Sequence, residues 1–238
     1  MTEILFRDEA YLRECDALVV AADARGVILN RTIFYPRGGG QPGDVGSLIL
    51  ADGSAVALGE TIYDSDRKTI LHVPAPGASL PSLGDRIFAR LDWATRYKRM
   101  RAHTALHLLS VVCPYPVTGG SVGDGEGRLD FDSGDVALDK ADVEARLNAL
   151  IARDAKTSTR WISDEDLDAD PGLVKTLSVK PPRGTGRVRL VDIEGLDLQP
   201  CGGTHVARTS EIGRARVIGV EKKGKINRRV RITLDEPA

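Results

Sequence analysis

The stretch Arg101-Ala-His-Thr-Ala-Leu-His-Leu-Leu109 places His103 and His107 four residues apart. On a helix, residues at that spacing have Cβ atoms about 6 Å apart, so both imidazoles can reach one ion at Zn–N distances of about 2.0–2.1 Å. A second string, Cys201-Gly-Gly-Thr-His205, repeats the spacing with a thiol and an imidazole. Its two glycines let the backbone bend so that both ligands can point inward. Together the two strings predict a tetrahedral zinc site of three histidines and one cysteine.

The first string lies on a predicted helix that runs from Asp92 to about Cys113. Asp92 is a competent N-cap, and the prolines at 114 and 116 end the helix. Apolar side chains recur at helical spacing, so we expect an amphipathic helix with one buried stripe. These side chains are Trp93, Tyr97, Met100 and Leu108.

Before this helix the sequence predicts six short strands separated by Gly, Asp and Pro turns, which indicates a small β-barrel. The strands are Ala17–Ala22, Val27–Phe34, Val45–Leu50, Ala55–Tyr63, Thr69–Val73 and Ile87–Leu91. Among them lies the segment Tyr35-Pro-Arg-Gly-Gly-Gly-Gln-Pro-Gly-Asp44, which is too rich in glycine to be a packed strand.

The rest of the chain is predicted to mix helix and strand. A second helix is expected over Asp139–Asp154, with short strands at Arg128–Phe131, Thr157–Ile162 and Arg187–Ile193. A hairpin pairs Ala215–Val220 with Arg229–Leu234 through the turn Lys222–Asn227. The predicted fold is therefore α+β, with an N-terminal small β-barrel domain at residues 1–91 and a zinc-binding α+β domain at residues 92–238.

Composition bounds the class of protein. The chain has 238 residues, is 42% hydrophobic, and has three cysteines, which do not suggest a disulfide framework. Its longest apolar runs fall short of the roughly 18 residues that would span a bilayer, and the N-terminus lacks the pattern of a signal peptide. We therefore expect a soluble cytoplasmic protein without a membrane partner.

Charge is unevenly distributed although the net charge is only −1. Residues 208–231 contain nine Lys or Arg against two Glu, whereas residues 130–170 contain twelve Asp or Glu against five Lys or Arg. Such clustering is typical of a surface that meets phosphates, although a solvated charged face gives the same pattern.

The residues around the histidines exclude some zinc proteins. Zincins need a glutamate beside the ligands, and residues 104–106 are Thr, Ala and Leu. Zinc ribbons need CxxC pairs, which the sequence lacks. Four protein ligands favour a structural zinc, whereas the neighbouring glycine-rich and basic segments favour catalysis on a phosphate-bearing substrate. Cys15, Cys113 and His72 are interpreted as structural residues.

At these motifs the sequence closely resembles the editing domain of alanyl-tRNA synthetase and the free-standing alanyl-tRNA editing proteins of the AlaX type. The segment Gly38-Gly-Gly-Gln-Pro-Gly-Asp-Val-Gly46 is similar to the glycine-rich motif of the medium-length members, which have a β-barrel before the editing domain. The resemblance covers almost the whole chain. The regions required for amino-acid activation are missing, which implies an editor that acts in trans.

The resemblance implies that the chain hydrolyses the ester of mischarged tRNA(Ala), chiefly Ser-tRNA(Ala), with Gly-tRNA(Ala) as a second substrate. It implies zinc ligation by His103, His107, Cys201 and His205. It also suggests that Thr118, in the loop Val117-Thr-Gly-Gly-Ser121, binds the serine hydroxyl.

From the residues themselves we expect a water at the zinc to attack the ester carbonyl, with Gly38, Gly39, Gly40 and Gln41 closing over the terminal adenosine. No acidic residue lies within the two zinc motifs, so no protein general base is assigned. Candidate phosphate contacts are Arg96, Lys98, Arg99, Lys222, Lys223, Lys225, Arg228 and Arg229. Two alternatives stay open: a non-catalytic tRNA- or RNA-binding module with a structural zinc, and a hydrolase of some other acyl ester. The oligomeric state is not predicted.

Overall fold

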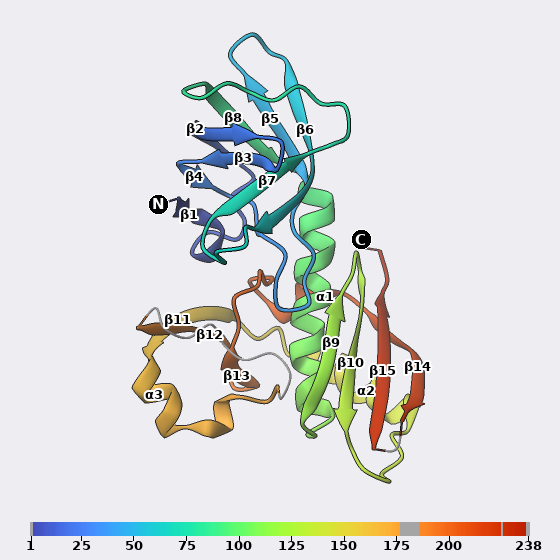
Figure 1. The fold of residues 1–238 in the computed structure, drawn as a ribbon. Helices are drawn as coiled ribbons and strands as arrows, with labels where there is room; N and C mark the ends of the chain where they lie inside the picture. Colours follow the sequence, from blue (N-terminus) through green and yellow to red (C-terminus); the bar gives the residue numbers. More distant parts are fainter. Residues whose placement is uncertain (1, 177–185, 225, 237–238) are drawn as a thin grey trace. The chain divides into compact units, whose positions relative to one another are not determined.

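A computed structural model describes residues 2–176, 186–224 and 226–236 and contains both helices and sheets (Figure 1). The chain folds as two compact units, Met1–Tyr97 and Lys98–Ala238. Helix α1 (Trp93–Val112) begins in the first unit and continues in the second. The predicted domains, residues 1–91 and 92–238, place their boundary just before this helix.

The first unit contains a closed barrel of six antiparallel strands in the order β2-β3-β7-β6-β5-β8. Alternate side chains point inward, and Val19, Leu29, Leu48 and Ala89 are completely buried in its core. The prediction of a small six-stranded barrel is thus confirmed. The strands are β2 (Glu14–Asp23), β3 (Gly26–Leu29), β5 (Gly46–Leu50), β6 (Ala55–Tyr63), β7 (Ile70–Pro74) and β8 (Arg86–Leu91).

The strand predicted over Val27–Phe34 was wrong in its extent. Asn30 interrupts it, because its side-chain Oδ1 accepts a hydrogen bond from the backbone N–H of Leu18 at 2.7 Å. The chain then leaves the barrel as β4 (Arg31–Thr32), which pairs in parallel with β1 (Glu3–Ile4). Strand β1 is followed directly by the 3-10 helix η1 (Leu5–Arg7).

The glycine-rich segment forms a tight turn. The backbones of Gly38 and Gln41 bond to each other in both directions, at 3.1 and 2.9 Å. Gly39 and Gly40 lie between them with φ values of 56° and 82°, which glycine adopts without steric cost. Gln41 is buried at the base of this turn.

Asp44 fixes the end of this segment against the barrel. Its Oδ2 accepts a hydrogen bond from the N–H of Tyr35, and its backbone carbonyl accepts one from the hydroxyl of Thr61 at 2.9 Å. A Cβ added at the adjacent Gly43 would lie 1.8 Å from the carbonyl oxygen of Thr61, so no larger residue fits there.

Helix α1 is capped by Asp92, whose Oδ1 accepts a hydrogen bond from the N–H of Thr95 at 3.1 Å, as predicted. The expectation of one buried stripe was wrong, because residues 99–110 are buried on every side of the helix. Their polar members are accommodated by hydrogen bonds. Arg101, for example, donates to the carbonyl oxygens of Ile212 and Asp235 at 2.6 and 2.7 Å.

The second unit contains two antiparallel sheets and helices (Figure 1). The four-stranded sheet has the order β14-β15-β10-β9, and its strands are β9 (Val117–Val122), β10 (Glu126–Asp132), β14 (Ala215–Lys223) and β15 (Asn227–Leu234). Helix α2 (Lys140–Ile151) contacts β14. The three-stranded sheet has the order β11-β12-β13, with β11 (Thr157–Ser163), β12 (Arg187–Ile193) and β13 (Asp197–Pro200). The short helices are α3 (Asp164–Ala169), η2 (Pro171–Leu173) and η3 (Thr209–Ile212).

Most elements of the second unit follow the sequence pattern, with two corrections. Val117–Ser121, predicted as a loop, belongs to β9, because Gly119 and Gly120 pair with β10. The hairpin turn is shorter than predicted, because the strands extend to Lys223 and from Asn227. Among the described residues, no helix is long and apolar enough to cross a membrane.

Candidate metal centre

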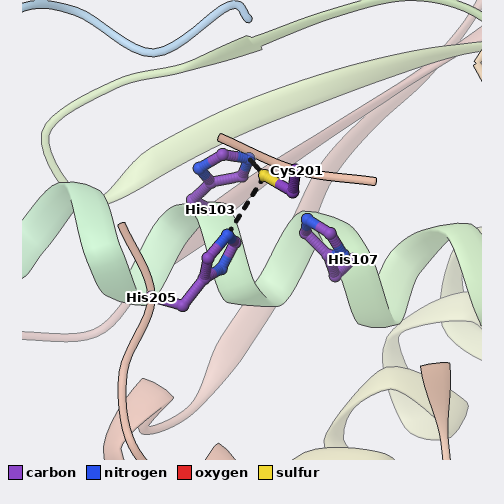
Figure 2. A group of neighbouring side chains, drawn as sticks. All are labelled: His103, His107, Cys201 and His205. Carbon is purple, nitrogen blue, oxygen red and sulfur yellow. Dashed lines mark hydrogen bonds between the residues drawn. The ribbon is translucent and has the colours of Figure 1, made fainter. Parts of the chain in front are cut away.

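Four side chains from two separate parts of the second unit meet at one point. His103 and His107 come from consecutive turns of α1, and Cys201 and His205 come from the segment after β13 (Figure 2). Their potential ligand atoms all lie within 4.8 Å of one another, so the group could hold a metal ion. The three imidazoles are at least 92% buried, with exposed fractions of 8%, 7% and 5%.

The spacing of these atoms fits a tetrahedral zinc site. With Zn–S and Zn–N bonds of about 2.3 and about 2.0–2.1 Å, neighbouring S and N ligands are separated by about 3.5 Å. The Sγ atom of Cys201 lies 3.6 Å from Nε2 of His103 and 3.2 Å from Nε2 of His205. The donor set of thiolate and imidazole is also the one that zinc prefers.

A buried carboxylate orients His107. Oδ2 of Asp197 lies 2.9 Å from Nδ1 of His107, and the side chain of Asp197 is completely buried. Asp197 is itself held by the ammonium group of Lys175 and by the amide of Gln199, which donates to Oδ2 at 2.6 Å. Such partners fix the tautomer and ring orientation of a metal-binding histidine.

His205 has a weaker orienting partner in the hydroxyl of Thr104, whose Oγ1 lies 3.2 Å from Nδ1. This hydroxyl donates to the carbonyl of Met100 at 2.9 Å and accepts from the N–H of Val206 at 3.2 Å. Thr104, which directly follows His103 on the helix, thus ties the second motif to α1.

The loop that carries Cys201 is held by Arg189 of β12. Its Nη1 donates to the carbonyl oxygens of Cys201 and Gly203 at 2.9 and 3.0 Å. The N–H of Gly203 points back to Sγ of Cys201 at 3.4 Å, and such a donor stabilises a thiolate.

Electrostatics favour the ligand forms of two of these groups. Burial alone would raise the pKa of the Cys201 thiol, but His103 and His205 outweigh burial and hold that pKa well below its usual value. Burial and the neighbouring His103 lower the pKa of His205 to about 3, which keeps the imidazole neutral. For His107, burial acts in the same direction, but its hydrogen bonds, chiefly to Asp197, raise the pKa to about 9.

Sequence reasoning missed Asp197, Lys175 and Gln199. Asp197 lies four residues before Cys201 and at the start of β13, a strand that was not predicted. One sequence signal could have found two of them. Positions 197 and 199, just before the cysteine motif, are both polar, and in a strand this spacing places both side chains on one face.

Thr118 lies on β9, and its Oγ1 donates to the carbonyl oxygen of Asp130 at 3.2 Å. The preceding Val117 donates its N–H to the carbonyl oxygen of Lys175 at 3.0 Å. Because the side chain of Lys175 binds Asp197, the strand that carries Thr118 is linked to the partner of His107.

The predicted glycine-rich substrate contacts lie in the first unit, and the Cys/His group lies in the second. Gly39 and Gly40 are exposed and Gly38 is half-buried, whereas Gln41 is 1% exposed. The contact of these residues with substrate stays a prediction.

One of the predicted phosphate contacts must be corrected. Arg96 is completely buried, and its guanidinium forms an ion pair with Asp44 and donates to the carbonyl oxygens of Ala10 and Ile33 at 3.0 and 2.7 Å. It is therefore a structural residue of the first unit. Arg99 is also largely buried, 2.6 Å from Asp124, whereas the half-buried Lys98 pairs with Glu236 at 3.0 Å.

The other predicted phosphate contacts belong to the β14–β15 hairpin. Lys222 and Lys223 are exposed, and Arg228 and Arg229 are half-buried. Lys225 lies outside the described residues.

Two parts of the chain match known sequence families. Residues 6–95 match tRNA synthetases class II (A), and residues 188–231 match the threonyl and alanyl tRNA synthetase second additional domain. The second range contains Cys201 and His205. These two matches make the chain similar to parts of aminoacyl-tRNA synthetases.

Individual relatives that match over nearly the whole chain identify the family more closely. The alanyl-tRNA editing protein AlaX-M of Methanosarcina acetivorans is 34% identical, over 98% of this chain and 99% of its own. AlaX-L of Pyrococcus horikoshii is 32% identical over 98% of this chain and 58% of its own. Alanine–tRNA ligase of Korarchaeum cryptofilum is 33% identical over 91% of this chain and 24% of its own. The chain belongs to the AlaX-M family of alanyl-tRNA editing proteins, which confirms the resemblance stated above.

Proposed function

We propose that this chain is a zinc-dependent aminoacyl-tRNA deacylase that edits mischarged tRNA(Ala) in trans, in the cytoplasm. Its main substrate is Ser-tRNA(Ala), and Gly-tRNA(Ala) is a second substrate. The observation that carries the proposal is the convergence of a Cys/His group in a chain that matches a named alanyl-tRNA editing protein over 98% of its length. Editing is needed because a synthetase pocket for alanine cannot strongly reject an isostere that adds one hydroxyl or lacks one methyl.

The zinc ion would be held by His103, His107, Cys201 and His205, within the part of the chain proposed as the editing domain, residues 92–238. When bound, zinc supplies a Lewis acid that polarises a carbonyl and acidifies water. Asp197 keeps Nδ1 of His107 occupied, so that Nε2 is the atom available to the ion. With His107 and Gln199 on one oxygen and Lys175 on the other, Asp197 holds the site rather than acting as a base.

Thr118 would distinguish a seryl from a glycyl ester. A hydroxyl has one proton, and Thr118 donates it to the carbonyl oxygen of Asp130. Oγ1 can therefore only accept a hydrogen bond from the substrate, and the hydroxyl of a seryl ester can donate it. Glycine offers no such donor. In the barrel unit, the turn of Gly38, Gly39, Gly40 and Gln41 would contact the terminal adenosine.

Deacylation assays test this function. Ser-tRNA(Ala), Gly-tRNA(Ala) and Ala-tRNA(Ala) are incubated with the purified protein and with a His103→Ala/His107→Ala variant. We expect rapid loss of the seryl ester, slower loss of the glycyl ester, stable Ala-tRNA(Ala), and no turnover by the variant. No turnover by a folded, zinc-loaded protein would instead favour a tRNA-binding module with a structural zinc. Turnover of simple acyl esters that lack tRNA would favour a general esterase.

A further inference from the structure

The outer face of the four-stranded sheet carries an ordered group of charges. Along β10 and β15, charged residues alternate with the buried Leu129, Phe131, Val230 and Ile232, so the charged residues share the face opposite the core. We call this surface the basic face; it consists of Arg128, Asp130, Glu221, Lys223, Arg229 and Arg231. This group holds four cations and two carboxylates, and by the same alternation Glu126 and Asp132, at the two ends of β10, also lie on this side of the sheet.

Asp130 is the centre of this group and is only 3% exposed. Its Oδ1 accepts from Nε of Arg229 at 2.7 Å, and its Oδ2 accepts from Nη2 of the same guanidinium at 2.9 Å. Oδ2 also accepts from Nζ of Lys223 at 2.9 Å and from Nη1 of Arg128 at 3.0 Å. One buried carboxylate therefore holds three cations from three strands. These cations hold the pKa of Asp130 well below its usual range, so it stays ionised.

The cations keep donors for a further anion. A guanidinium has five N–H groups, of which Asp130 takes two from Arg229 and one from Arg128. The side chains of Lys223, Arg231 and Arg128 are 52%, 41% and 28% exposed. Because their positions are already fixed by protein contacts, these side chains lose little conformational freedom when they bind phosphate.

The basic face borders the proposed amino-acid contact. Gly119 of β9 lies directly opposite Asp130 in the sheet, and a Cβ there would sit 3.2 Å from Oδ2. The next residue back is Thr118, which donates to the backbone of the same Asp130. Figure 1 shows β9, β10, β15 and β14 side by side, so the face extends from the strand of Thr118 across the sheet.

We propose that the basic face binds the sugar–phosphate backbone of the tRNA acceptor stem, with Asp130 as a positioning residue that keeps Arg128, Lys223 and Arg229 in place. The inference rests on the proposed function, because the RNA is the substrate of that function. The exposed cationic groups of Lys223, Arg231 and Arg128 favour RNA as the partner, because its backbone presents regularly spaced negative charges.

The test is the salt dependence of binding to uncharged tRNA(Ala). Arg128→Gln and Arg231→Gln are compared with Arg146→Gln, a matched control on α2 whose side chain is 53% exposed. We expect each variant of the basic face to lower the affinity and to reduce the slope of log K against log salt by about 1, and the control to retain both. Unchanged slopes in both variants of the basic face would overturn the inference.

An Asp130→Asn variant tests whether Asp130 positions the cations, or whether RNA binding depends only on the total charge of the basic face. Removal of a negative charge should tighten binding if only total charge matters, whereas we expect weaker binding because the three cations lose their shared acceptor. Tighter binding would contradict the positioning role. Thermal unfolding checks that the variant folds, and if it does not, the two arginine variants decide the outcome.

Deacylation by the same proteins keeps the two proposals apart. If the wild-type protein deacylates Ser-tRNA(Ala) but the arginine variants keep the wild-type salt dependence of tRNA binding, the proposed RNA contact is refuted and the proposed deacylase function stands. If the slopes fall as expected but no ester is hydrolysed, the RNA contact stands and the function is refuted.

Discussion

Asp197 and His107 form a buried pair, with Oδ2 of the carboxylate 2.9 Å from Nδ1 of the imidazole. A second partner of the same carboxylate, Lys175, also accepts the backbone hydrogen bond of Val117 at the start of β9. One lysine thus connects the carboxylate that orients His107, a proposed metal ligand, to the strand that carries Thr118. The proposed metal site therefore depends on these outer contacts as well as on the four proposed ligands.

Substitution of Asp197 by Asn should weaken metal binding by about 10- to 100-fold, the usual cost of losing an outer partner of a metal-binding histidine. Asn retains one acceptor oxygen but cannot serve His107, Lys175 and Gln199 together. Competition with a chromophoric zinc chelator measures the affinity. Asp192→Asn, on β12 and pairing with the neighbouring strand, is the matched control and should bind zinc as the wild type does. Equal affinity in both variants would exclude the orienting role of Asp197.

Replacement of Thr118 by Val should slow deacylation of Ser-tRNA(Ala) selectively. Loss of one hydrogen bond of about 0.5–1.5 kcal/mol corresponds to about a 2- to 13-fold decrease in kcat/KM. Gly-tRNA(Ala) should be hydrolysed at the wild-type rate, because glycine offers no hydroxyl. Thr118→Ser restores the hydroxyl and should restore activity on the seryl ester. Equal losses on both esters would show that Thr118 does not read the serine side chain.

The sequence was sufficient for features that depend on local pattern. Alternation and turn residues predicted the six barrel strands, and the spacing of His103, His107, Cys201 and His205 predicted the group that the structure brings together. These predictions succeed because hydrophobic periodicity and ligand spacing can be recognised within short continuous stretches of sequence.

Features that depend on distant contacts could not be predicted. Arg96 follows a helix start and lies in a basic segment, so it has the pattern of a surface residue. Its burial depends on Asp44, which is 52 residues away in the sequence. Two of the partners of Asp197, His107 and Lys175, are likewise 90 and 22 residues away. A single sequence does not reveal such pairs, because tertiary contacts override local preference.

Replacement of Arg96 by Met should destabilise the barrel unit by about 3–5 kcal/mol, since removal of one member of a buried ion pair leaves the other charge uncompensated. The carbonyl oxygens of Ala10 and Ile33 would lose their donor as well. Urea unfolding measures the change. Arg90→Met is the control, because Arg90 is 55% exposed in its pair with Glu14 and should contribute at most about 1 kcal/mol. A small effect at Arg96 would contradict the structural role assigned to it.

The stability of the barrel should depend on His72. Burial lowers its pKa from 6.5 to about 4, with a smaller opposing effect from the carbonyl of Val27. Between these pH values the unfolded chain binds more protons than the folded chain, so stability is complete above pH 6.5 and falls as the pH drops towards 4. The loss should approach about 3 kcal/mol at the acid end.

Urea unfolding of the wild type and of His72→Gln over this pH range isolates the contribution, because every other group titrates in both proteins. The variant should show a shallower loss of stability with acid. Parallel curves would mean that burial does not hold His72 neutral in the folded chain, where its Nδ1 lies 2.9 Å from the carbonyl oxygen of Val27 and its Nε2 lies 2.7 Å from Oγ1 of Thr32.

Removal of zinc with a chelator should abolish deacylation while most of the secondary structure persists. Met100, Leu108 and Leu109 of α1 are completely buried, and this apolar burial stabilises the helix without a metal ion. Arg101 ties the same helix to the carbonyl oxygen of Ile212. Circular dichroism and activity are followed in parallel, and added zinc should restore turnover. A chain that unfolds as the metal leaves would have a structural zinc instead, because in such proteins the metal supplies the folding free energy.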